Sequence, residues 1–479
     1  MNYALNTFAL SALILISLWA SGQNFLSTKI ESEKAVEDFE YFQNALEIGH
    51  PSLYGHTDSV KLQSSFGKIL KQLSTSSGVS HIEFLGLLTE IMQMVGCGHS
   101  TILFPRHYGN NIDSVDLYLP LKVRLTENKI FVKENLSNAD IPSGSEIISI
   151  NGKSSSEIVK FLLPKIPADK GIVTRQIRFL EQLFPYFFAI YYGVSPNYEI
   201  KYAVQNDPLT YSKNIDALKG GDHIIKSLNQ LIFGKVPLEF SIENAETAYL
   251  KITTFTDYPY RQAGINFEDT LSKIFKQLDS QNTKNLILDL RGNNGGNMEY
   301  GEFLFTFFID KPTNYFGDAE IKKTVADGSY EYSNMPRLID YLGSMYHVEE
   351  SGKVYVLSIL DTLQPNPNHF KGKLYILSNG LSYSSTACFI AHMKDRERGI
   401  LIGEMPGGAY SGLNTQPSVK VVLPNSSFEL FFNATHIKLN LNKSGINTPV
   451  DYEVIPSINN ILDQIDVEKE YALRLISKQ

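Results

Sequence analysis

The C-terminal half of the chain, residues 236–479, alternates short apolar segments with segments of helical spacing. "TAYLKITTF", "NLILDLRG", "GKLYILSNG" and "GILIGEM" have the length and composition of buried strands. "FEDTLSKIFKQL" and the run "STACFIAHM" instead repeat apolar residues every three or four positions, as amphipathic helices do. Strands that alternate with helices predict a layered α/β domain built on a mainly central sheet.

Two regions precede this domain. Apolar spacing in "AVEDFEYFQNALEIGHPSLY" and "HIEFLGLLTEIMQMVG" predicts helices within residues 33–95, and Gly96 ends the second helix. "LYLPLKVRLTENKIFVKEN" predicts two strands joined by a turn, and Glu146 to Ile150 predicts another. The polar, weakly patterned residues 206–235 predict a linker.

Composition excludes several classes of protein. The net charge of −8 argues against nucleic acid as the main partner, because phosphate binding needs a basic field. Cys97 and Cys388 are the only cysteines, too few for a disulfide scaffold, and no metal-binding spacing occurs. We therefore expect two buried thiols, with a single bridge between them after export as the alternative. We expect no metal and no cofactor.

The N-terminus resembles a secretory signal. An apolar run from Phe8 to Trp19 precedes the small residues Ala20-Ser21-Gly22, which predicts a signal peptide over residues 1–22 and a secreted or periplasmic mature chain. A retained membrane anchor is the alternative. No other segment of the sequence has the length and apolar character of a membrane span.

Three motifs could carry chemistry, and the first is "LDLRGNNGG". A strand ending at Asp289 runs into Gly292, Gly295 and Gly296, and a helix follows. Exposed N–H groups at such a turn suit an anion. Because neither the phosphate-loop pattern nor the dinucleotide pattern is present, an oxyanion pocket or a plain tight turn remains.

The second motif, "SNGLSYSSTACF", places several serines where a strand feeds a helix. Ser384 at the helix start could be a nucleophile, because the helix dipole favours its alkoxide. The alternative is that Ser382 or Ser384 only caps the helix. The third motif is "VGCGHSTILF", in which His99 could be a general base or a structural residue of a turn.

Taken together, these motifs resemble the C-terminal-processing, or tail-specific, serine peptidases, a family that includes the tricorn core. "GCGHST", "IPSGSEIISINGKSSSEI", "LILDLRGNNGG", "LSYSSTACF", "ILIGEMPGG" and "GINTPVDYEV" are similar to elements of the family in its usual order. The resemblance implies an N-terminal helical region at 23–112, a PDZ-like domain at 113–205 and, after the linker, a crotonase-like α/β catalytic domain at 236–479.

The resemblance also implies roles for individual residues. Ser384 matches the nucleophile, and the N–H groups of Gly295, Gly296 and Ser385 would form the oxyanion pocket. The bacterial processing proteases pair the serine with a lysine, but that position is Gly408 here. The tricorn-like branch uses an N-terminal histidine instead, which His99 matches.

Several positions depart from the family. Asn442 stands where the tricorn-like branch has the carboxylate that orients its histidine, so Glu404, Asp451 or Glu453 would have to replace it. Ala387 replaces the glutamate after the nucleophile, and Cys97 replaces the aspartate before Gly98. These changes leave room for a weak or inactive enzyme.

The sequence therefore predicts a secreted or periplasmic serine endopeptidase that hydrolyses unfolded or tail-exposed polypeptides without a metal or cofactor. Its PDZ-like region would bind a peptide as an added strand. One alternative is an inactive family member that binds peptide or lipid, and another is acyl-CoA chemistry on the related fold. The sequence does not fix the oligomeric state or the substrate.

Overall fold

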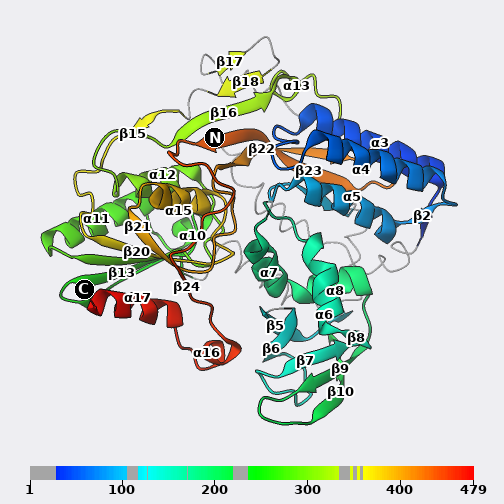
Figure 1. Ribbon diagram of the computed structural model, residues 1–479, viewed down its shortest axis with the longest axis horizontal. Helices are drawn as coiled ribbons and strands as arrows, with labels where there is room; N and C mark the ends of the chain where they lie inside the picture. Colours follow the sequence, from blue (N-terminus) through cyan, green and yellow to red (C-terminus); the bar gives the residue numbers. More distant parts are fainter. Residues whose placement is uncertain are drawn as a thin grey trace.

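The computed structural model describes residues 28–104, 117–126, 128–169, 171–219, 236–333, 346–348, 353–356 and 360–478. Within these ranges the chain is a mixed α/β protein (Figure 1). The predicted signal peptide lies outside the described residues. Across the ranges given above, no helix combines the length and the apolar character that a membrane span needs.

The C-terminal half is built on a six-stranded sheet in the order β12-β13-β14-β20-β21-β24. β12 pairs antiparallel with β13, and all other neighbours are parallel. The strands are β12 (Leu238–Asn244), β13 (Thr247–Ile252), β14 (Asn285–Asp289), β20 (Lys373–Ser378), β21 (Gly399–Gly403) and β24 (Tyr452–Glu453). The central strands read as continuous apolar runs because both faces of the sheet are covered.

Helices cover both faces of this sheet. Leu286, Leu288 and Ile376 belong to the main hydrophobic core, whereas Ile287 and Tyr375 pack with α17 on the opposite face. The helices of this half are α10 (Asp257–Gln262), α11 (Phe267–Ser280), α12 (Met298–Thr306), α15 (Ser385–Asp395), α16 (Ile458–Leu462) and α17 (Val467–Ser477). This layering confirms the predicted α/β arrangement.

The N-terminal region is helical, as predicted, and contains α3 (Ser32–Gly49), α4 (Ser59–Ser74) and α5 (His81–Val95). Apolar spacing had indicated the first and the third of these helices. The short strands β1 (Lys29–Ile30) and β2 (Val79–Ser80) pair beside them. Ser80 and Glu83 form a capping box at the start of α5. Gly96 ends α5 in a left-handed conformation with φ of 61°, which glycine adopts at no steric cost.

A third sheet joins the N-terminal helices to the C-terminal half (Figure 1). Its order is β17-β18-β16-β23-β22, and β3 pairs with the other end of β23. The strands are β3 (Thr101–Leu103), β16 (Phe316–Lys322), β17 (Tyr346–Val348), β18 (Lys353–Val356), β22 (Gly412–Val422) and β23 (Glu429–Leu439). α13 (Lys323–Ala326) follows β16, and β15 (Thr313–Asn314) pairs with β19 (Thr362–Leu363).

Residues 117–219 form a separate antiparallel sheet with helices against it. The order is β10-β9-β7-β6-β5, and β8 pairs with β7. The elements are β4 (Leu117–Tyr118), β5 (Leu121–Thr126), β6 (Lys129–Asn135), β7 (Glu146–Ile150), β8 (Lys153–Ser154), α6 (Ser155–Leu162), η3 (Leu163–Lys165), α7 (Val173–Gln182), α8 (Phe184–Tyr192), β9 (Asn197–Ala203), β10 (Thr210–Asp216) and β11 (Leu218–Lys219). In Figure 1, α7 lies where this unit meets the rest of the molecule.

One expectation needs correction here. Residues 206–235 were predicted as a linker, but 210–216 form β10, which pairs with β9 along its full length. β10 is an edge strand on which Ile215 is the one buried residue. It therefore lacks the alternation of apolar and polar residues by which a half-buried strand is identified.

Candidate active site

The parallel pairing of β14 with β20 brings two of the predicted motifs together. Asp289 at the end of β14 pairs with Leu377 at the end of β20, so the loops that leave both strands start side by side. The Tyr383 N–H donates to the Asn293 carbonyl at 3.0 Å and closes one loop onto the other. The carboxyl ends of parallel strands are the usual place for ligands in α/β sheets.

Ser384 occupies a strained position at the start of α15. Its φ is 54° and its ψ is −130°, a region that non-glycine residues rarely enter and that is concentrated at functional sites. Its side chain makes no capping hydrogen bond to the helix. Cap geometry therefore does not account for this serine.

The neighbouring serines have structural partners. The Ser382 hydroxyl donates to the Leu290 carbonyl at 2.8 Å and accepts from the Asn379 N–H at 3.0 Å. The Ser378 hydroxyl donates to the Glu404 carbonyl at 2.8 Å. Ser382 and Ser378 thus stabilise the loop, whereas the Ser384 hydroxyl faces an imidazole.

That imidazole belongs to His99. His99 Nε2 lies 3.1 Å from Ser384 Oγ, although the two residues are 285 positions apart in the chain. The turn that carries His99 runs from the end of α5 into β3, and β3 is held in place by pairing with β23. The structure therefore brings the predicted base and the predicted nucleophile within hydrogen-bond distance.

Tyr383 orients the ring from its other nitrogen. The Tyr383 hydroxyl lies 2.9 Å from His99 Nδ1, and the two rings stack with centroids 4.7 Å apart. A Cβ at Gly98 would collide with the Tyr383 hydroxyl, so the close approach needs glycine at that position. When Nδ1–H donates to this hydroxyl, Nε2 is free to accept the Ser384 proton.

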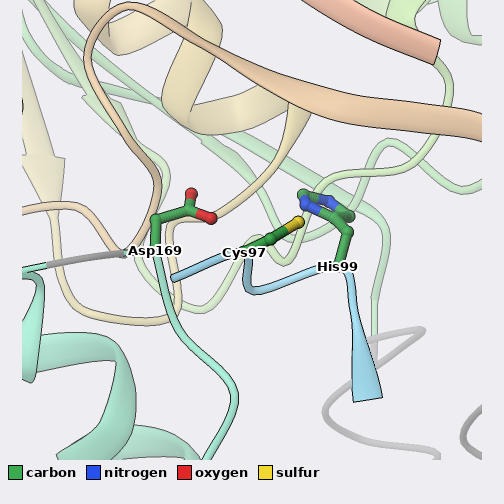
Figure 2. A group of neighbouring side chains, drawn as sticks. All are labelled: Cys97, His99 and Asp169. Carbon is green, nitrogen blue, oxygen red and sulfur yellow. The ribbon is translucent and has the colours of Figure 1, made fainter. Parts of the chain in front are cut away.

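A carboxylate that the sequence analysis missed lies beside this pair. One oxygen of Asp169, one nitrogen of His99 and the sulfur of Cys97 lie within 4.8 Å of one another (Figure 2). Asp169 is buried, and its oxygens accept from the Gly98 N–H at 2.8 Å and the Ala409 N–H at 2.9 Å. It follows η3 in a segment without any recognisable motif, so no sequence signal pointed to it.

Burial and two charges together set the protonation of His99. Desolvation lowers the pKa of His99 to about 4, Asp169 opposes this shift, and the cation of Arg175 adds to it. The imidazole is therefore neutral at physiological pH, which is the state that a general base needs.

The predicted oxyanion donors lie around Ser384 but differ in availability. The Gly295 N–H already donates to Asn293 Oδ1 at 3.0 Å. Within the described part of the chain, the N–H groups of Gly296 and Ser385 have no acceptor. A Cβ at Gly295 would lie 2.7 Å from the Cβ of Ser384, so the glycine lets this loop approach the serine closely. Gly296 and Ser385 are the available donors.

The four candidate orienting groups have partners elsewhere. Asn442 binds Asp395 through its backbone and side-chain amides, at 2.9 and 3.0 Å. Glu404 forms a buried ion pair with Arg178, and Asp451 accepts from Lys394 and from the Leu401 N–H. Glu453 lies exposed on β24. Asp169, and none of these four, belongs to the group around His99.

Gly408 explains why a lysine does not serve here. A Cβ at Gly408 would lie 2.5 Å from the Cβ of Ala387 and 3.6 Å from the Ser384 nitrogen. A lysine at 408 would therefore clash with the first turn of α15. The sequence has no lysine at this position, and the packing leaves no space for one.

A cavity of about 170 Å³ opens beside the His99 ring. Apolar and aromatic side chains dominate its lining, among them Leu85, Phe104, Phe187, Ile190 and Phe431. At the end near His99 it is lined by Arg175, whose guanidinium stacks over Tyr383 at 4.1 Å and donates to Asn294 Oδ1 at 2.6 Å. Burial lowers the pKa of Arg175 to about 10, so the side chain stays a cation at neutral pH.

Comparison with known proteins identifies the domain around this site. Residues 246–436 match peptidase family S41. The chain carries a peptidase family S41 domain. Members of this family are serine-type hydrolases, and the predicted resemblance to C-terminal-processing peptidases is confirmed at this level.

Solved structures share the fold of this chain. The structure of mature CPAF complexed with lactacystin aligns over 94% of this chain and 99% of that one, with a TM-score of 0.64 and 13% identity. The structure of mature CPAF aligns over 94% and 98%, with a TM-score of 0.61 and 13% identity. No curated protein sequence matches the chain. At this level of identity the likeness concerns the fold alone.

Proposed function

We propose that this S41 chain is an exported serine-type endopeptidase in which Ser384 is the nucleophile and His99 the general base. The contact of 3.1 Å between His99 Nε2 and Ser384 Oγ is the single observation that carries the proposal. The strained backbone of Ser384 supports it, because such strain is retained where function requires it.

In the first step, Ser384 Oγ attacks the carbonyl carbon of the scissile peptide bond while His99 Nε2 accepts the hydroxyl proton. The tetrahedral oxyanion is placed against the N–H groups of Gly296 and Ser385, which have no acceptor in the described residues. His99 then gives the proton to the leaving amine, and water repeats the sequence on the acyl-enzyme.

We assign the role of electrostatic partner to Asp169 in place of the four candidates from the sequence. The Asp169 carboxylate raises the pKa of His99 against the lowering effect of burial. It therefore stabilises the imidazolium that forms during attack. Tyr383 supplies the orientation, because its hydroxyl contacts Nδ1.

The substrate is a polypeptide, and the cavity beside His99 would take one of its apolar side chains. The aromatic lining favours large residues, and Arg175 gives the cavity one positive end. We further propose that the sheet of β5 to β10 is PDZ-like and adds a substrate segment as a strand, and that residues 236–479 are crotonase-like. Export follows from the expected signal at 1–22.

A peptide phosphonate tests the proposal, since it labels an activated serine covalently. We expect labelling of the wild type, none in Ser384→Ala and none in His99→Ala, with melting temperatures that stay close to the wild type. Labelling that survives in Ser384→Ala but is lost in Ser385→Ala would move the nucleophile by one residue. Absence of labelling in the wild type would favour the alternative, a binding protein on the same scaffold.

A further inference from the structure

Three side chains of the kind that bind zinc meet beside Ser384. Figure 2 shows the Cys97 sulfur between the Asp169 carboxylate and the His99 imidazole. Because the three ligand atoms lie within 4.8 Å of one another, a point exists no more than about 2.8 Å from each, whereas zinc binds sulfur at about 2.3 Å and nitrogen or oxygen at about 2.0–2.2 Å. A small contraction of the group would complete three bonds.

The proposed hydrolysis does not use the thiol in this group. Cys97 is buried and accepts from Asn414 Nδ2 at 3.4 Å. Each Asp169 oxygen accepts one backbone N–H, which leaves a second lone pair on each oxygen for a cation.

We propose that Cys97, His99 and Asp169 form a reversible inhibitory Zn²⁺ site. Binding forms one bond each to sulfur, nitrogen and oxygen and releases the Cys97 proton to solvent. The thiolate and the carboxylate then balance the two charges of the metal. A mixed sulfur, nitrogen and oxygen set selects zinc over magnesium or calcium, which prefer oxygen alone.

Inhibition follows from the single lone pair of a neutral imidazole. If the metal binds Nε2, it takes the atom that faces Ser384 Oγ. If it binds Nδ1, the ring proton must sit on Nε2, which then cannot accept the serine proton. This consequence rests on the proposed function, whereas metal binding itself does not.

The residues around the site should also keep zinc binding reversible. The Arg175 guanidinium lies over the Tyr383 ring, which stacks on His99, and its cation opposes a second positive charge there. Three protein ligands also leave one coordination position open, unlike the closed four-ligand sites that hold structural zinc. We therefore expect zinc to dissociate when a chelator is added.

Co²⁺ titration of the purified protein tests the site without any need for peptidase activity, because a thiolate bound to Co²⁺ absorbs in the near ultraviolet. We expect the band to saturate at one equivalent in the wild type and in Cys388→Ser, a second buried thiol outside the group. The band should be absent in Cys97→Ser and in Cys97→Ala. Asp169→Asn should weaken binding by roughly tenfold or more.

A wild type without the band, or a band that persists in Cys97→Ser, would overturn the metal site. In the second arm, Zn²⁺ should slow phosphonate labelling of the wild type, EDTA should restore it, and Cys97→Ser should need at least about tenfold more zinc. Equal inhibition of both proteins would overturn the inhibitory role. Absence of labelling even without zinc would contradict the proposed hydrolysis, and the cobalt spectra would then decide the metal site alone.

Discussion

Two histidine–serine pairs lie next to each other in this molecule, and the distance between the imidazole nitrogen and the serine oxygen is the same in both. His99 Nε2 is 3.1 Å from Ser384 Oγ, and His50 Nε2 is 3.1 Å from Ser100 Oγ. His99 and Ser100 are even consecutive residues. The distance between a base and a hydroxyl therefore does not distinguish a candidate active site from a structural contact, and the surroundings must.

The second pair is the more deeply buried of the two. His50 is 0% exposed and Ser100 is 1% exposed, and Asn414 contacts the same His50 nitrogen at 3.4 Å. Ser100 leads into β3, whereas Ser384 stands at the start of a helix. His99 is only partly buried and lines the cavity together with Arg175; Ser100 lines the same cavity, but its partner His50 does not. The partial exposure of His99 and the N–H groups of Gly296 and Ser385 beside Ser384 distinguish the candidate functional pair.

The largest expected difference is between replacing Ser384 and replacing Ser100. Ser384→Ala removes the nucleophile, so we expect kcat/KM on an unstructured peptide to fall by at least about 10³-fold with an unchanged melting temperature. Ser100→Ala removes one buried hydrogen bond and should lower the free energy of unfolding by about 1 kcal/mol or more while activity stays within about threefold. Loss of activity in Ser100→Ala at full stability would break the distinction.

The next effect concerns the Asp169 carboxylate beside His99. Asp169→Asn removes the carboxylate that raises the His99 pKa, so kcat/KM should fall by roughly 10- to 100-fold. The pH midpoint should also move. Activity rises as the imidazole loses its proton, near pH 4 in the wild type, and the midpoint should lie lower in the variant.

The matched control is Asp451→Asn, which removes a carboxylate bound to Lys394 and the Leu401 N–H. We expect its pH midpoint to equal that of the wild type. A midpoint that moves in Asp451→Asn and stays in Asp169→Asn would return the orienting role to a residue proposed from the sequence.

The stability of the protein should depend on pH because of His50, the histidine of the more deeply buried pair. Burial lowers the pKa of His50 to about 3, below the value of about 6.5 in the unfolded chain. The unfolded state therefore binds more protons between these values, so stability is complete above about pH 6.5 and falls as the pH falls. His50→Asn should reduce the slope between pH 6 and 4 by about 1.4 kcal/mol per pH unit.

Ser100→Ala serves as the control, because it removes the partner of His50 without removing a titrating group. Its slope should stay close to that of the wild type, although its stability is lower. Urea unfolding at several pH values measures both quantities. An unchanged slope in His50→Asn would show that another group causes the acid sensitivity.

The two pairs also show what the sequence can reveal. Ser384 and His99 could be proposed as a pair because each sits in a short motif that follows a predicted strand or helix, and the structure places the two side chains 3.1 Å apart. Asp169 and Arg175 were missed because they come from a segment without motifs, which the fold brings against the active site from outside the S41 domain.

Asn442 illustrates the same limit from the other side. Its place in the chain, just before a recognisable element, made it the expected partner of His99. In the structure, the amides of Asn442 donate to Asp395 instead. The Asp395 carboxylate also accepts from the Lys443 N–H and the Tyr410 hydroxyl. Long-range contacts of this kind have no signature in local sequence, since they depend on which loop ends meet.

The smallest effect is therefore expected at Asn442. Asn442→Glu would place a second carboxylate against that of Asp395 and remove the side-chain hydrogen bond between the two residues. We expect the free energy of unfolding to fall by about 1 kcal/mol. Because the side chain contacts Asp395 and not the imidazole, the pH midpoint of kcat/KM should stay at the wild-type value, near pH 4. Measured on the same peptide as Asp169→Asn, an upward shift of that midpoint would show that position 442 reaches His99 in solution, and the carboxylate partner would then have to be sought there instead of at Asp169.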